Sequence, residues 1–137
     1  MSTVYLHKAG RPDDELGQVK MNGKVYRSKF GPDQQVGHVD SVSGKIFQRR
    51  LGPDEYIGRV DLHNGKVYRH VPLGTDEYLG EVHADGRMYR HESLAADDYM
   101  GRMPDFISYA HSGAAFLLLV LPAFEALDAV AGDQVTG

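Results

Sequence analysis

The chain has 137 residues and carries 15 Lys and Arg against 19 Asp and Glu, which gives a formal charge of −4. This charge argues against a nucleic-acid-binding protein, whose affinity depends on neutralising phosphates. The absence of cysteine excludes disulfides, thiolate zinc sites, iron–sulfur clusters and cysteine nucleophiles. Composition therefore predicts an ordinary globular chain and indicates no particular reaction.

Residues 4–103 contain an internal repeat, marked by an aromatic residue at positions 5, 26, 47, 68 and 89. Two columns of glycine accompany the aromatic column. The strand glycines, each preceded by an apolar residue, are Gly17, Gly37, Gly58, Gly80 and Gly101. The turn glycines are Gly23, Gly44, Gly65 and Gly86. These three columns give a five-fold repeat with a period of 21 residues.

Each turn glycine follows Asn, Ser or Asp and lies between two short β-prone runs. Asn64-Gly65 is an example, and this pattern predicts a hairpin with a type I′ turn, in which both residues have positive φ. The joints between repeats, such as Gly52-Pro53-Asp54, also contain turn residues, so the chain reverses again there. The sequence therefore predicts a mainly β fold: a β-hairpin repeat that forms an antiparallel meander of about ten strands. The sheet is expected as a curled sheet, a barrel or a rosette.

The strand glycines predict a bulge in each repeat. Ile57 and Val60 are three residues apart, so in a regular strand their side chains would lie on opposite faces. A bulge at Gly58 would bring both onto one face and bend the strand. The alternative is a regular strand with one core face and one half-covered face.

The repeat ends after Met103, and residues 104–137 are predicted to form a separate C-terminal helical segment beside the hairpin domain of residues 1–103. Pro104-Asp105 suits a first helical turn, and residues 106–124 contain no Asp, Glu, Lys or Arg. Pro122 is expected to kink or end the helix. This apolar segment either packs on the sheet or pairs with its copy in a dimer, or else it anchors the chain in a membrane.

Histidine and aromatic columns are the candidates for chemistry. His70 and His91 share a repeat column with His7, so we consider His70 and His91 as metal ligands; the alternative is a polar strand face whose residue type varies. The aromatic column either stacks on a sugar or base or packs across strands. No phosphate-binding loop and no Gly-x-Ser-x-Gly motif occurs, and we expect no cofactor.

The repeat resembles MORN repeats through Tyr-x-Gly at 56–58, 78–80 and 99–101 and through Asn-Gly-Lys at 64–66, but it lacks the second Gly-x-Gly half and has a shorter period. It is more similar to uncharacterised bacterial hairpin-repeat proteins with Gly-x-Val…Gly-Lys-Val-Tyr units, some with apolar tails. That resemblance implies a scaffold or membrane-associated role and no activity. We therefore expect a non-enzymatic module for protein interaction or self-association, cytoplasmic or attached to the membrane through 106–124. The alternative is a small-ligand or metal-binding protein.

Overall fold

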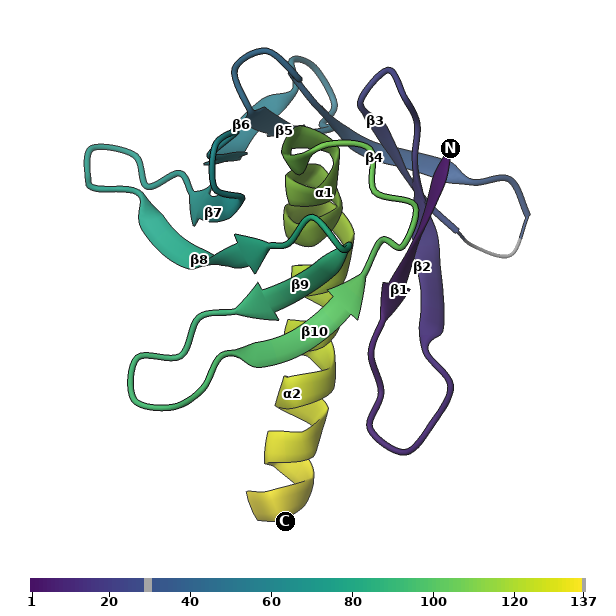
Figure 1. Cartoon of the computed structure of the whole chain (residues 1–137), viewed down its shortest axis with the longest axis vertical. Helices are drawn as coiled ribbons and strands as arrows, with labels where there is room; N and C mark the ends of the chain where they lie inside the picture. The colour runs from purple at the N-terminus through teal and green to yellow at the C-terminus, as the bar shows by residue number, and fades with distance from the viewer. Residues whose placement is uncertain (29–30, 137) are drawn as a thin grey trace.

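Ten antiparallel strands follow one another around a closed barrel, and the last strand pairs with the first (Figure 1). A computed structural model describes residues 1–28 and 31–136, with the side chains of 131–136 left out. The strands are β1 (Ser2–Leu6), β2 (Asp14–Val19), β3 (Lys24–Arg27), β4 (Gln34–Val39), β5 (Lys45–Gln48), β6 (Glu55–Val60), β7 (Lys66–Arg69), β8 (Glu77–Val82), β9 (Arg87–Arg90) and β10 (Asp98–Arg102). The predicted meander is confirmed, and of the three forms considered it is the barrel.

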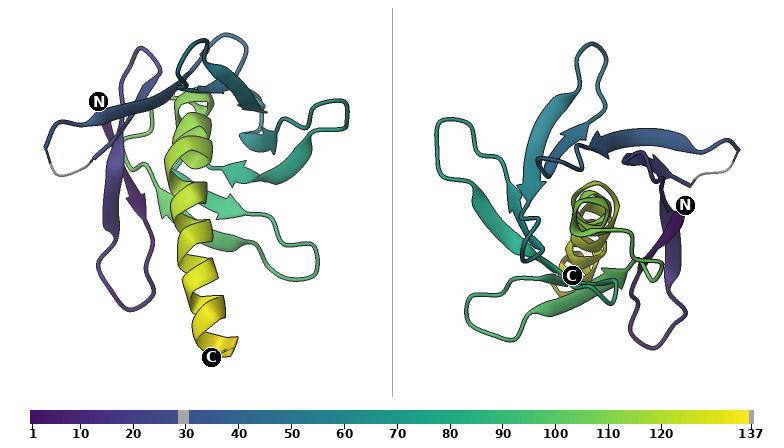
Figure 2. Two further views of the ribbon diagram at one scale, coloured as in Figure 1. Left: turned by 180° about the vertical axis from the view of Figure 1, so that it is seen from behind. Right: turned by 45° about the horizontal axis from the view of Figure 1, so that its top comes forward.

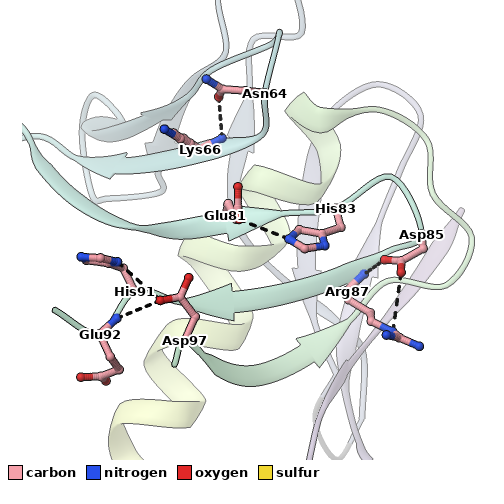
Figure 3. A network of polar contacts seen from close by, with 9 residues as sticks. All are labelled: Asn64, Lys66, Glu81, His83, Asp85, Arg87, His91, Glu92 and Asp97. Atoms are coloured by element: carbon pink, nitrogen blue, oxygen red, sulfur yellow. Dashed lines mark hydrogen bonds and ion pairs between the residues drawn. The ribbon is translucent and has the colours of Figure 1, made fainter. Parts of the chain in front are cut away.

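The tight turns lie at the positions predicted, but their geometry differs from type I′. A type I′ turn needs a positive φ at both central residues. Here the turn glycine has a positive φ, whereas the residue before it does not have a positive φ. The side chain of that preceding residue instead accepts a hydrogen bond from the amide two positions on, as in Asn64 Oδ1 with Lys66 N at 3.0 Å (Figure 3). Asn, Asp and Ser are therefore favoured here for side-chain capping of the turn, with only the glycine in the left-handed region.

Long loops join the other ends of the strands, and these hairpins flare outward from the barrel (Figure 2). We call them petals; they are β1–β2, β3–β4, β5–β6, β7–β8 and β9–β10. In every petal the strand register shifts at the strand glycine. The residue that loses its partner is the apolar one before that glycine: Leu16, Val36, Ile57, Leu79 or Met100. The predicted bulge is thus confirmed in all five repeats, and both Ile57 and Val60 pack with the core.

The barrel closes because the fifth repeat is divided between the two ends of the hairpin region. β10 supplies its glycine strand and β1 its aromatic strand, and Tyr5 pairs with Arg102 across the junction. No tight turn connects these two strands. β1 begins at the N-terminus of the chain, and β10 continues into the segment that leads to the helix. Ser2 Oγ donates a hydrogen bond to the Asp105 carbonyl oxygen and ties these two segments together.

A single apolar helix fills the barrel along its axis (Figures 1 and 2). It comprises α1 (Tyr109–Ala115), one wide π turn (Phe116–Val120) and α2 (Leu121–Thr136). Every residue from Ala110 to Leu121 is buried. Inward-facing valines and other apolar residues from all ten strands or their ends surround it, among them Val4, Val25, Ile46, Val67 and Met88, each fully buried. The C-terminal segment and the barrel therefore share one hydrophobic core, and of the alternatives left open the structure shows the helix packed on the sheet over residues 110–121.

The helix boundaries correct two expectations. The helix begins at Tyr109 after the N-cap Ser108, so Pro104-Asp105 lies before it in an irregular segment. Pro122 does not end the helix, which continues to Thr136. A proline ring clashes with the carbonyl four residues earlier in a regular helix. Here a wider turn precedes Pro122, in which Leu121 N donates to Phe116 O, and the helix passes the proline without stopping.

Candidate functional site

The helix leaves the barrel at the end where the petals flare, and we call this end the mouth (Figure 2). Arginines from three repeats surround the helix there: Arg27, Arg69 and Arg90, the last residues of β3, β7 and β9. Arg69 Nη2 lies 3.7 Å from Glu125 Oε1, and the Arg90 guanidinium lies 5.6 Å from the ring centre of Phe124. Arginine side chains therefore contact the first exposed turn of α2.

A groove of about 1040 Å³ opens on one side of the helix at the mouth. Most of its apolar residues come from the helix and from two bulges, among them Val36, Ile57, Leu117, Leu118 and Leu121, and the petal loops add Leu51 and Pro72. Its polar residues include four arginines, Arg27, Arg49, Arg50 and Arg69, together with Gln34, Gln35, Gln48, Tyr56 and His70. A smaller hollow of about 300 Å³ lies on another side of the helix, and Arg27 borders both.

The histidine column forms one contact repeatedly. His7, His70 and His91 each follow the aromatic strand of a petal and lie beside the aspartate six residues later. The distances from Nδ1 to the carboxylate are 3.3 Å to Asp13, 3.4 Å to Asp76 and 3.5 Å to Asp97. In two of these petals the carboxylate also accepts a hydrogen bond from a loop amide: Asp76 from Val71 at 3.4 Å and Asp97 from Glu92 at 3.2 Å (Figure 3). Each histidine therefore joins the beginning of its petal loop to the end of the same loop.

The two predicted metal ligands, His70 and His91, lie in separate petals. His70 packs on Tyr56 and His91 on Tyr78, with ring centres 4.7 and 4.8 Å apart, and no contact joins the two histidines. Among the residues that the structure describes, no group of three or more His, Asp or Glu side chains could hold a metal ion. Metal binding through His70 and His91 stays a prediction.

Arginines link two of these aspartates to neighbouring repeats. Arg102 Nε lies 2.8 Å from Asp13 Oδ2, and Arg59 Nε lies 3.1 Å from Asp76 Oδ2. Hydrogen bonds from these arginines hold the pKa of Asp13 and of Asp76 below the ordinary value of 3.8. Both carboxylates therefore remain charged at neutral pH and join adjacent petals around the ring.

The aromatic column lies on the outer face of the barrel, where its rings are half-buried. Its members pack across strands within a petal, as in Tyr68 with Tyr78 at 5.6 Å and Tyr89 with Tyr99 at 5.5 Å between ring centres. Burial raises the pKa of Tyr78 and Tyr99, so these phenols are neutral. Cross-strand packing is thus the arrangement found for these tyrosines.

One helical segment, Tyr109–Val130, is long and apolar enough to cross a membrane by length and composition alone. Half of its most apolar stretch is buried inside the barrel. Beyond Pro122 the helix is largely exposed, and its apolar residues there gather on one side: Phe124, Leu127 and Val130, at positions three apart. Leu127 is 42% exposed and Val130 is 53% exposed.

No protein-family profile matches the chain, and no curated protein or solved structure is significantly similar to it. Sequence reasoning missed the groove. The groove combines residues up to 98 positions apart, from Arg27 to Glu125, and only the closed barrel brings them together.

Proposed function

We propose that this protein is a non-catalytic module that self-associates through the exposed half of its C-terminal helix. The observation that carries this proposal is the change in the helix at Pro122. Before it, every side chain from Ala110 onward is enclosed by the barrel. After it, the helix carries an apolar stripe in which Leu127 and Val130 are exposed and Phe124 is half-buried against the core. We call these three residues the helix stripe.

A second helix would stabilise this projecting segment. Residues 122–136 continue the helix beyond the barrel, and at about 1.5 Å per residue such a segment extends roughly 22 Å. Isolated helices of this length are marginally stable in water, and an apolar stripe adds a cost of exposure. Packing the helix stripe against a partner offsets both costs.

Charge favours a second copy of the chain as that partner, in antiparallel orientation. No Lys or Arg follows Arg102 in the sequence, whereas Glu125 and Asp128 lie on the projecting helix. Two parallel helices would therefore place like charges side by side. In an antiparallel pair, the C-terminal end of one helix, which is the negative end of its dipole, lies near the mouth arginines of the other copy, and the two helix dipoles oppose one another favourably.

Sedimentation equilibrium of the full chain tests the proposal. We expect a dimer at micromolar concentrations, and we expect Leu127→Glu to convert it to a monomer by placing a charge in the paired stripe. Ala129→Glu is the matched control, because it adds the same charge at an exposed position on the other side of the helix. A monomeric wild-type chain, or equal disruption by both variants, would contradict the proposal.

A membrane-attached role is the second candidate, favoured by the length and apolar composition of Tyr109–Val130. Against it, the most apolar half of that segment is enclosed in the barrel, and the exposed half carries Glu125 and Asp128. Carboxylates are costly in hydrocarbon. Flotation of the full chain with phosphatidylcholine vesicles distinguishes the two roles, because co-flotation supports membrane attachment and a dimer in the unfloated fraction supports self-association.

A further inference from the structure

The groove at the mouth pairs an apolar floor with a cationic rim, and no residue of the helix stripe borders it. The floor consists of Leu117, Leu118 and Leu121 from the helix and of Val36 and Ile57 from the bulges of β4 and β6. Val36 and Ile57 are only half-buried although both pack on the core. The bulges therefore leave apolar side chains facing an open hollow of about 1040 Å³.

Two of the four groove arginines are already neutralised. Arg50 Nη2 lies 3.0 Å from Glu55 Oε2, and Arg69 lies 3.4 Å from Glu77 and 3.7 Å from Glu125. These ion pairs leave little capacity for a further anion at that side of the groove.

The other two arginines carry the uncompensated charge. Arg49 Nη1 donates to Gln35 Oε1 at 2.9 Å, which is a neutral acceptor, and Arg27 forms no ion pair within residues 1–28 and 31–136. Both lie beside the first half of β4: Arg27 pairs in register with Gln34, and the Arg49 amide donates to the Val36 carbonyl. Arg27 and Arg49 thus lie at the ends of the two strands beside β4, and both border the groove together with Gln34 and Gln35.

We propose that this groove binds an amphiphilic anion, a molecule with one carboxylate or phosphate head and an apolar body. Guanidinium groups bind carboxylate and phosphate oxygens through paired hydrogen bonds, and the side-chain amides of Gln34 and Gln35 supply further donors. The apolar body lies on Leu118, Leu121 and Ile57, in the manner of ligand sites that combine an apolar lining with a few polar groups.

The remaining groove residues limit the charge of the ligand. Asp33, Glu55 and Glu125 also border the groove. A ligand with several negative groups would approach these carboxylates and be repelled. The site therefore selects one anionic head, located at Arg27 and Arg49, over a polyanion.

Calorimetric titration of the full chain with decanoate and with decyl phosphate, each below its micelle concentration, tests the inference and separates the two kinds of head group. We expect at least one of them to saturate at one molecule per chain. Arg27→Gln and Arg49→Gln should each weaken that binding by about tenfold or more, the effect of losing one charge-assisted hydrogen bond. Arg87→Gln is the control, since Arg87 lies by a tight turn at the opposite end of the barrel and should leave binding unchanged.

Further probes test both parts of the site. Decanol lacks the charge and inorganic phosphate lacks the apolar body, so each should bind at least tenfold more weakly than the better amphiphile. The inference is overturned if neither amphiphile binds saturably, if both arginine variants bind like wild type, or if inorganic phosphate binds as tightly as decyl phosphate. Leu127→Glu should retain binding, so a failure of self-association and a failure of this site are distinguishable.

Discussion

Single side chains decide how closely the helix and the barrel approach one another. Gly113 on α1 faces Val60 on β6, and a Cβ at position 113 would lie 2.5 Å from the Val60 Cβ. Next to it, Ser112 is completely buried, and its hydroxyl has no hydrogen-bond partner in the described part of the chain. Because Gly113 has no side chain, the helix can approach β6 this closely.

The closeness of Gly113 to Val60 predicts an inverted effect of Gly113→Ala. In an exposed helix this change stabilises by about 1 kcal/mol through helix propensity. Here we expect a loss of about 1–3 kcal/mol, because the new methyl overlaps Val60. Urea denaturation measures the difference. Adding Val60→Gly, which removes the overlapped Cβ together with both γ-methyl groups, should remove most of the penalty of Gly113→Ala relative to Val60→Gly alone. Two additive substitutions would contradict this packing account.

At the level of elements, periodicity predicted the strands and the bulges, but local geometry depended on contacts that the sequence does not display. The 3-residue spacing of Ile57 and Val60 was sufficient to predict the register shift at Gly58, which the structure confirms. The turn type was wrong because Asn64 acts through its side chain and keeps a negative φ. The expectation that Pro122 could end the helix was also wrong, because a wide turn before the proline accommodates its ring.

The strand glycines lead to a prediction at this level. A Cβ at Gly58 would overlap the Tyr68 carbonyl oxygen and lie 2.7 Å from Leu117 Cδ2 of the helix. We therefore expect Gly58→Val to lower the free energy of unfolding by about 1–3 kcal/mol. Gln18→Val, which introduces the same side chain at a half-exposed position of β2, should leave it unchanged or slightly raised. Equal thermal midpoints for Gly58→Val and wild type would count against the close approach.

For the whole molecule, closure of the ring and the place of the helix define the fold. The repeat predicted the meander and its strand number, yet it left open a curled sheet, a barrel and a rosette, because closure depends on the accumulated bend of five bulged strands. The split fifth repeat, in which Tyr5 pairs with Arg102, is what joins the ends. The groove could not be predicted, because which arginine remains unpaired depends on the positions of Glu55, Glu77 and Glu125 in the closed barrel.

The Arg102–Asp13 ion pair spans the same junction and predicts a pH dependence. The pKa of Asp13 is lowered in the folded state, so its contribution to stability is present above the unfolded value of 3.8 and is lost as pH falls through the lowered folded pKa. Arg102→Met should therefore reduce the free energy of unfolding at pH 7 by up to about 1 kcal/mol, as expected for a partly exposed pair.

Thermal unfolding at several pH values checks this prediction. The difference between wild type and Arg102→Met should shrink in acid, below the ordinary pKa of the carboxylate. Arg87→Met, at an exposed arginine paired with Asp85, serves as the control for loss of a surface charge. A difference that stays constant from neutral pH to strong acid would assign the effect to the loss of arginine packing on Tyr5 instead.

The apolar helix is the core of the barrel up to Leu121 and is largely exposed beyond it, and thiol accessibility tests this division most directly. The chain contains no cysteine, so Ser112→Cys and Ala129→Cys each introduce a single thiol, the first at a fully buried position and the second at an exposed one. The thiol at position 112 should react with an aromatic disulfide reagent only as fast as the protein unfolds, and the thiol at position 129 should react at once, with or without phospholipid vesicles. Equal reaction rates at the two positions, or protection at position 112 only when vesicles are present, would contradict this division.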